Sequence, residues 1–154
     1  MKYIILEDIR SAYNVGAIFR TADASGVAKV FLVGYTPTPR DRFGRVQAEI
    51  DKTSLGASKT MAWEQVATTK EIVERLQADG VCVAAVELAP GSVSLKDFKE
   101  PADVAYIVGN EVEGVSKDAL ELADVIVELP MLGQKESLNV SVTAGIVLYQ
   151  GITS

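Results

Sequence analysis

Apolar segments that read as strands alternate with helical patterns along most of the chain, and this alternation constrains the fold more than any other feature. The strand-like segments are 2–6, 29–35, 81–88, 104–109 and 125–130. The helical patterns cover 14–25, 63–80, 117–122 and a final segment from Ser137 onward, whereas 36–56 reads as a loop. Strands such as "VCVAAV" are apolar without alternation, as expected when both sheet faces are covered. The sequence therefore predicts an α/β fold with a mainly parallel sheet and helices on both faces.

The composition fits one domain over residues 1–154, because 48 % of the residues are hydrophobic and 23 % are charged. The sequence holds no apolar run long enough to span a membrane and no cationic leader. We therefore expect a soluble, cytoplasmic protein that does not associate with membranes.

Histidine is absent and Cys82 is the only cysteine, which excludes several kinds of site. Nucleophiles of the Ser-His-Asp or Cys-His type are impossible, and so are zinc sites built on histidine or on a thiolate cage. No clustered carboxylate spacing argues for another metal, so we expect none. Any proton transfer must use carboxylates, Lys, Tyr, Arg or water.

Charge is distributed unevenly, although the net charge of −6 is a poor sign for a nucleic-acid-binding protein. Residues 1–60 hold nine basic and six acidic side chains, whereas residues 61–154 hold six and fifteen. The basic side chains of the first part include Arg40, Arg42, Arg45, Lys52 and Lys59. They form either a local phosphate-binding patch or an ordinary solvated loop.

The stretch "NVGAIFRTADASGV", residues 14–27, combines an amphipathic helix with an arginine on its polar side. The apolar stripe consists of Val15, Ile18, Phe19 and Ala22. Arg20 projects away from this stripe, one turn after Gly16. Taken alone, Arg20 is a surface residue that pairs with Asp23 or Glu7.

Two further loops follow strands, at the edge where ligands gather in parallel sheets. "GNEVEG", residues 109–114, is either a ligand loop that lets a ligand approach its glycines or a simple turn with exposed acids. In "PMLGQKESLN", residues 130–139, Ser137 either caps the final helix or contacts a ligand together with Asn139. Neither a P-loop nor a G-x-G-x-x-G motif occurs in the chain.

Taken together, "NVGAIFRTADASGV", "YIVGNEVEGVS" and "LPMLGQKESLNVSVTAG" resemble the three motifs of the SpoU (TrmH-type) family of RNA ribose 2′-O-methyltransferases, in the SPOUT superfamily. "KTSLGASKTMAWE" is similar to the segment that follows the first βαβ unit in this family. The resemblance spans nearly the whole chain in family order. It implies a C-terminal trefoil knot, S-adenosylmethionine as cofactor, tRNA or rRNA as substrate, and a homodimer whose sites are completed across the interface.

The resemblance also implies roles for particular residues. It assigns cofactor binding to Gly109, Leu129, Met131 and Leu138, and it matches Arg20 to the family's catalytic arginine. The other recurrent polar positions of the family's catalytic site are matched by Asn14, Glu111, Ser137 and Asn139. Gly16 would leave room for nucleotide and cofactor.

Substrate binding is where the chain departs from many relatives, because it resembles the catalytic core without an added RNA-binding domain. RNA would then be bound by Arg20 together with Arg40, Arg42, Arg45, Lys52 and Lys59, or with the help of an accessory RNA-binding partner. The final helix, "VSVTAGIVLY", is apolar enough to pack against a second chain, although core burial explains it almost as well.

The chemistry leaves two roles open for Arg20. An arginine side chain is a poor base, since its pKa lies above about 12. We therefore expect Arg20 to bind phosphate and to stabilise the developing alkoxide, whereas the resemblance implies that it takes the proton directly. The alternatives to an enzyme are a non-catalytic member that binds RNA or cofactor, and an unrelated α/β nucleotide-binding module.

Overall fold

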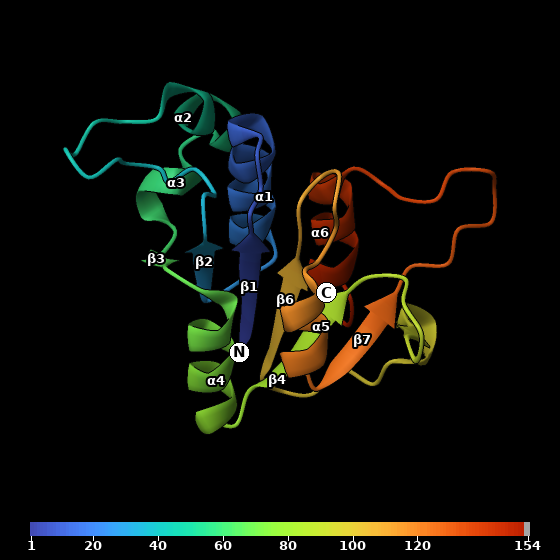
Figure 1. Cartoon of the computed structure of the whole chain (residues 1–154). Coiled ribbons are helices and arrows are strands. Elements are labelled where there is room, and N and C mark those ends of the chain that lie inside the picture. The colour runs from blue at the N-terminus through green and yellow to red at the C-terminus, as the bar shows by residue number, and fades with distance from the viewer. Residues whose placement is uncertain (153–154) are drawn as a thin grey trace.

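A computed structural model describes residues 1–152, and its strands form one seven-stranded sheet in the order β3-β2-β1-β6-β4-β7-β5. Every pair of neighbouring strands is parallel (Figure 1), which confirms the predicted parallel α/β fold. The strands are β1 (Lys2–Glu7), β2 (Lys29–Val33), β3 (Trp63–Val66), β4 (Cys82–Val86), β5 (Val93–Ser94), β6 (Val104–Val108) and β7 (Val125–Glu128).

Helices cover both faces of the sheet, as expected from strands without polar alternation. One face carries α1 (Ala12–Ala24), α2 (Ala48–Ser54), α3 (Ala57–Thr60) and α6 (Val140–Leu148). The other face carries α4 (Thr69–Ala78) and α5 (Lys117–Leu122). A short 3₁₀ helix spans Leu95–Asp97, and its Leu95 packs in the same cluster as α1 and α6. No helix within residues 1–152 is long and apolar enough to cross a membrane.

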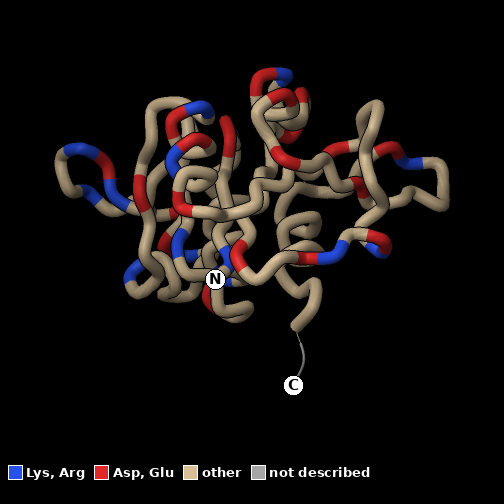
Figure 2. Tube along the Cα trace, turned by 90° about the horizontal axis from the view of Figure 1, so that it is seen from below, with Lys and Arg blue, Asp and Glu red and all other residues tan. Residues whose placement is uncertain are grey.

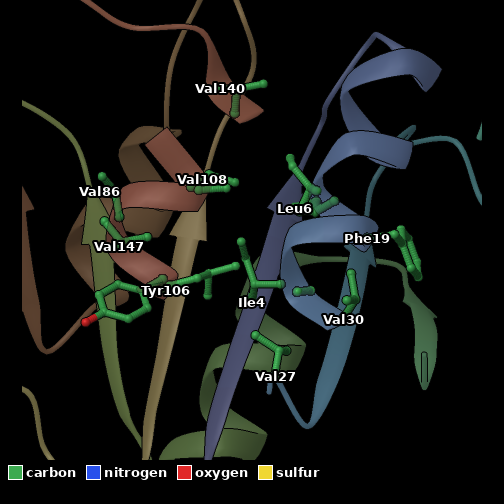
Figure 3. Close-up of a cluster of buried hydrophobic side chains, with 14 of the residues drawn as sticks. Ile4, Leu6, Phe19, Val27, Val30, Val86, Tyr106, Val108, Val140 and Val147 are labelled. Carbon is green, nitrogen blue, oxygen red and sulfur yellow. The ribbon is translucent and has the colours of Figure 1, made fainter. Parts of the chain in front are cut away.

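Successive residues of a strand pack into two separate hydrophobic clusters, one on each face of the sheet, because side chains alternate between the faces of a strand. Ile4 and Leu6 of β1 are fully buried under α1 and α6, in the cluster shown in Figure 3. Ile5, between them, is fully buried in the second cluster under α4 and α5. The central strands are therefore held from both sides, which fixes the carboxyl ends of β1, β4 and β6 relative to one another.

Two predicted segments contain an element of another type in the structure. The helix expected over 63–80 is wrong in its first part, because Trp63–Val66 pairs with β2 as an edge strand and the helix begins only at Thr69. The Thr68 side chain accepts the backbone N–H of Glu71 and thereby starts α4 after the strand. The loop expected over 36–56 is interrupted by α2, whose start is capped by Gln47.

Both ends of the described chain meet near the amino edge of the sheet. The Lys2 ammonium donates to the carbonyl oxygens of Leu148 and Gln150, at 2.9 and 3.0 Å, and lies 3.0 Å from a Glu100 carboxylate oxygen. After β7, the chain returns toward the middle of the sheet, where α6 packs against α1 and β6 (Figure 1). The first strand therefore holds the end of the last helix.

Candidate functional site

A cavity of about 640 Å³ lies at the carboxyl ends of β4, β6 and β7. All four residues predicted to bind a cofactor, Gly109, Leu129, Met131 and Leu138, line this cavity, and so do Glu111, Ser137 and Asn139. Segments that are far apart in the sequence thus meet at the edge of the sheet where ligands of parallel α/β folds bind.

Sequence reasoning missed one wall of the cavity, the segment 86–90 that follows β4. This segment carries no motif, and the one signal for it is its position at the end of the predicted strand 81–88. Glu87 stands at its start, and its carboxylate accepts the backbone N–H groups of Leu88 and Val115, at 3.1 and 3.0 Å. Glu87 therefore ties the β4 end to the loop that follows β6.

The loop 109–114 folds back on itself and closes one side of the cavity. Asn110 is buried, and its side-chain oxygen accepts the backbone N–H groups of Val112 and Glu113, at 2.8 and 2.9 Å. A Cβ on Gly109 would collide with the backbone of Gly114 and Val115, since Gly114 turns back at a φ of 73°. The two glycines are thus needed to close the loop itself.

The Asn110 amide also joins the ends of three strands. Its nitrogen donates to the Asp8 carbonyl oxygen at 2.9 Å and to the Tyr35 hydroxyl at 2.8 Å. Asp8 adopts a left-handed φ of 51° after β1, and its carboxylate accepts the Tyr35 backbone N–H at 3.2 Å. Positive φ is uncommon outside glycine, so this junction stores strain at the edge that carries the cavity.

Glu111 joins the second motif to the first. Its carboxylate accepts the backbone N–H groups of Arg10 and Ser11, at 2.8 and 2.9 Å, and the side-chain amide of Asn14 at 3.1 Å. Partial burial raises the pKa of Glu111, but the hydrogen bonds from Arg10, Ser11 and Asn14 outweigh it and lower the pKa below its usual value. Asn14 is buried, so the pair predicted for the site fixes the start of α1.

Arg20 lies on the exposed side of α1 and does not line the cavity. Within residues 1–152 its guanidinium makes no hydrogen bond and no ion pair, so the alternative in which Arg20 is a surface residue paired with Asp23 or Glu7 is not supported. Glu7 is buried and is bonded to Thr69 and Ser116 on the other side of the sheet. The Arg20 guanidinium is therefore available to a ligand.

The space expected beside Gly16 is filled by α2, so that prediction is wrong. A Cβ on Gly16 would collide with the Thr53 side chain and would lie 2.9 Å from the Ile50 carbonyl oxygen. Gly16 is buried, and Ile50 of α2 is fully buried in the same cluster as α1. This glycine lets two helices approach each other and leaves no room for a ligand.

The loop 130–139 differs from the prediction at its end. The final helix begins at Val140 rather than near Ser137, because Asn139 caps it by accepting the Ser141 backbone N–H at 2.9 Å. Ser137 is exposed in the loop and lines the cavity, so it does not cap the helix. No hydrogen bond joins residues 130–138 to any other part of the described chain.

The five basic residues predicted to bind RNA besides Arg20 lie on the surface outside the cavity. Arg40, Arg42 and Arg45 are exposed on a hairpin loop, residues 38–47, at the left edge of Figures 1 and 2. Lys52 and Lys59 are exposed on α2 and α3, and Lys59 lies 3.5 Å from an Asp51 carboxylate oxygen. Lys52 and Lys59 thus lie on the helices that pack against α1, whereas the three arginines lie on the projecting hairpin loop.

The helix α6 exposes an apolar ridge made by Val142, Ile146 and Tyr149. Between 41 and 49 % of each of these residues is exposed, although core packing fully buries Ala144 and Val147 on the opposite side. Gly145 faces Thr21 of α1, next to Arg20, since a Cβ built there would lie 3.8 Å from the Thr21 Cγ2 atom. The ridge and Arg20 thus belong to neighbouring helices.

The chemistry of the cavity lining restricts its ligand. Its walls are apolar around Leu129, Met131 and Leu138, and four carboxylates line it, those of Glu87, Glu111, Glu113 and Glu136. No Lys or Arg belongs to the described lining, so the cavity suits a neutral or cationic molecule better than a phosphate. A volume of about 640 Å³ fits a molecule of nucleoside size. Within residues 1–152 no group of acids and cysteine gathers to hold a metal ion.

Comparison with known proteins agrees with this geometry. Residues 1–149 match the sequence model of the SpoU rRNA Methylase family. The chain is 33 % identical over 145 residues to the 23S rRNA (guanosine-2'-O-)-methyltransferase RlmB of Neisseria meningitidis, covering 94 % of this chain and 55 % of the relative. It is 33 % identical over 150 residues to the tRNA (guanosine(18)-2'-O)-methyltransferase of Escherichia coli, covering 96 % of this chain and 61 % of the relative.

A solved structure is similar as well. The AdoMet-bound rRNA methyltransferase of Sinorhizobium meliloti superposes with a TM-score of 0.86 at 30 % identity, covering 96 % of this chain and 54 % of that chain. The chain thus spans little more than half the length of the relatives that it matches.

Proposed function

The chain belongs to the SpoU rRNA Methylase family, and from this premise we propose that it transfers a methyl group from S-adenosylmethionine to a ribose 2′-OH of tRNA or rRNA. The observation that carries the proposal is the cavity in which Gly109, Leu129, Met131 and Leu138 meet. The names of two relatives, one acting on 23S rRNA and one on tRNA, support an RNA substrate.

The cavity fits S-adenosylmethionine in size, in polarity and in charge. The apolar side chains of Leu129, Met131 and Leu138 would hold the adenine, while backbone groups beside Gly109 would bind its polar edge. The carboxylates of the lining favour a ligand that carries positive charge. When bound, the cofactor supplies the methyl group from its sulfonium centre. The lack of lining Lys or Arg in the described chain argues against an unrelated module that binds nucleotide phosphates.

Arg20 is the proposed catalytic residue, and Asn14 and Glu111 position it. The hydrogen bonds that Glu111 accepts from Arg10, Ser11 and Asn14 fix the start of α1, so the helix presents Arg20 in one direction. Its unpaired guanidinium would bind an RNA phosphate and stabilise the alkoxide that develops as the 2′-OH loses its proton. Ser137 and Asn139 would contact the reacting nucleotide from the opposite loop.

A homodimer would bring Arg20 to a cofactor. Within one chain Arg20 does not line the cavity, so a single copy leaves the proposed catalytic residue apart from the methyl donor. The exposed ridge of Val142, Ile146 and Tyr149 lies on the helix that packs beside Arg20. Pairing of two copies through this ridge would bury apolar surface and complete each site with the partner's arginine.

Three further properties belong to the proposal. The return of the chain from β7 to pack α6 against α1 and β6 supports a C-terminal trefoil knot. Residues 1–154 would act as one catalytic domain in the cytoplasm, where RNA substrates are found.

RNA would contact Arg40, Arg42, Arg45, Lys52 and Lys59, and an accessory RNA-binding partner would offset the net charge of −6.

Transfer of labelled methyl from S-adenosylmethionine to unmodified total RNA tests the proposal. The wild-type protein should label RNA, and Arg20→Ala should lower the rate by roughly 100-fold or more. Lys99→Ala removes another exposed cation and should leave the rate unchanged. Arg20→Lys should also lose most of the activity, because a lysine cannot make planar bidentate contacts with a phosphate.

Calorimetric titration with S-adenosylmethionine separates the alternatives. Binding without methyl transfer would favour the non-catalytic member of the fold. If the cofactor failed to bind, the proposal would be overturned. Light scattering at micromolar concentration checks the dimer, and a monomer would contradict a site that is shared between two chains.

A further inference from the structure

The hairpin loop, residues 38–47, displays an aromatic side chain that the core does not need. Phe43 is 67 % exposed at the tip and belongs to neither buried cluster. The guanidinium carbons of Arg42 and Arg45 lie 4.8 and 5.0 Å from the centre of its ring. An exposed phenylalanine with two arginines close to it is not explained by burial, because most of the residue stays in contact with solvent.

The tip is held in one conformation by its own polar groups. The Asp41 carboxylate accepts the backbone N–H groups of Phe43 and Arg45, at 2.8 and 3.0 Å, and pairs with the Arg45 side chain at 2.8 Å. The Arg40 side chain donates to the Gly44 carbonyl oxygen at 2.8 Å. The backbones of Arg40 and Val46 pair in an isolated antiparallel β-bridge. The ring is therefore presented by an ordered turn, which reduces the entropy lost when a ligand binds.

The chemistry of this tip suits unpaired RNA. Bases that have left a helix stack on aromatic rings and on guanidinium planes, and the phosphates beside them bind arginine. The segment 40–45 carries three arginines and one aspartate, in a protein whose net charge is −6. Base pairs inside a duplex are already stacked on one another, so a single exposed ring offers them little.

We propose that the hairpin loop binds an unpaired segment of the RNA substrate, with Phe43 stacked on a base and with Arg42 and Arg45 on the neighbouring phosphates; this rests on the proposed function. The loop follows β2, whereas the cavity follows β4, β6 and β7, so the two project from the same edge of the sheet at its opposite ends (Figure 1). Residues 38–47 do not line the cavity, so this contact would bind RNA without taking part in methyl transfer. Its loss should therefore raise KM for RNA and leave kcat almost unchanged.

Two substitutions at one position separate stacking from general apolar contact. Phe43→Leu keeps an apolar side chain and removes the ring, whereas Phe43→Tyr keeps the ring. Binding is measured by fluorescence anisotropy with a short fluorescein-labelled single-stranded RNA of mixed sequence and with the duplex of that RNA. Val93→Ala, at an exposed apolar position on β5, is the matched control. Circular dichroism checks that each variant is folded.

Phe43→Leu should weaken single-strand binding roughly tenfold and raise KM to the same extent, while Phe43→Tyr and Val93→Ala should resemble the wild type. The wild type should bind the single strand more tightly than the duplex. Phe43→Leu that binds like the wild type would overturn the proposal, and so would a preference for duplex. Methyl transfer by the wild type tests the premise separately: if it labels total RNA while Phe43→Leu is unchanged, only the role of the hairpin loop fails.

Discussion

The two loops that border the cavity are built in opposite ways. In the loop 109–114, Asn110 and Glu111 make hydrogen bonds to backbone groups, and Gly109 is packed against Gly114. In the loop 130–139, residues 130–138 make no hydrogen bond within the described chain, and Leu132 is 98 % exposed. The polar residues Asn110 and Glu111 of the first loop are bonded to the protein itself, whereas Ser137 in the second loop is available to a ligand.

This difference indicates that the polar residues of one motif stabilise the fold, whereas those within 130–138 of another are free to bind a ligand. The polar residues of the first loop hold β1, β2, β6 and α1 in place, so their loss should lower the free energy of unfolding. Loss of the polar residues within 130–138 should instead impair binding and catalysis, because these residues make no hydrogen bond to the rest of the described chain. Four substitutions test this division, and they follow in order of their expected effect on the free energy of unfolding.

Gly109→Ala should have the largest effect. A Cβ at this position would overlap the backbone of Gly114 and Val115, which cannot move aside as a flexible side chain would. We expect a loss of about 3 kcal/mol in the free energy of unfolding, measured by urea denaturation. Gly133→Ala, in the second loop, is the matched control, because nothing lies within 4 Å of a Cβ at that position. Equal losses in the two variants would remove the contrast between the loops.

Asn110→Ala should come next, at about 2 kcal/mol, because it leaves the backbone N–H groups of Val112 and Glu113 and the Asp8 carbonyl oxygen without their partner. The same urea measurement applies, and hydrogen exchange of residues 112 and 113 should accelerate. Unchanged exchange at these two amides would show that the loop closes without Asn110.

Glu111→Gln should destabilise by about 1 kcal/mol at neutral pH, because the neutral amide is a weaker acceptor for the backbone of Arg10 and Ser11. The pKa of Glu111 is lowered in the folded protein, so its contribution is present above the ordinary pKa of a glutamate and is lost as pH falls through the lowered value. Unfolding curves from neutral to acidic pH should therefore converge for wild type and variant. A gap that stayed constant with pH would show that ionisation of Glu111 is not involved.

Ser137→Ala should have the smallest effect on stability, below about 0.5 kcal/mol, because Ser137 is exposed and does not cap α6. Methyl transfer to RNA should nevertheless fall, since Ser137 lines the cavity. Thermal unfolding and the transfer assay are measured on the same preparation. A variant that is destabilised but fully active would reverse the proposed division between the loops.

Much of the fold could be predicted from the sequence because its cause is local. Apolar runs such as that of β6 form strands wherever two helical layers cover them, and Gly26 and Gly80 follow α1 and α4 with positive φ, as expected at helix ends. The strand order could not be predicted in this way, because β6 lies between β1 and β4, and its pairing with β1 joins residues about a hundred positions apart. The local pattern of Trp63–Val66 predicts a helix, but pairing with β2 overrides this pattern and makes the segment a strand.

The candidate site was predicted less completely, for a similar reason. The resemblance supplied Gly109, Leu129, Met131 and Leu138, and the cavity brings all four together. Gly16 was misread because the sequence does not reveal that α2 packs against it. Phe43 carried no signal in the sequence, since its exposure and its neighbouring guanidinium groups appear only in the folded hairpin loop.

The strand order has a consequence for synthesis of the chain. β1 pairs with β2 on one side and with β6 on the other, and Lys2 lies opposite Val104. During translation, the second edge of β1 therefore stays open until about 100 more residues have been added, which takes roughly 5 to 20 seconds. Through that interval the nascent chain exposes a strand edge that can pair with a neighbouring chain. Slow codons placed between β3 and β6 should increase aggregation, whereas the same codons placed after β6 should not.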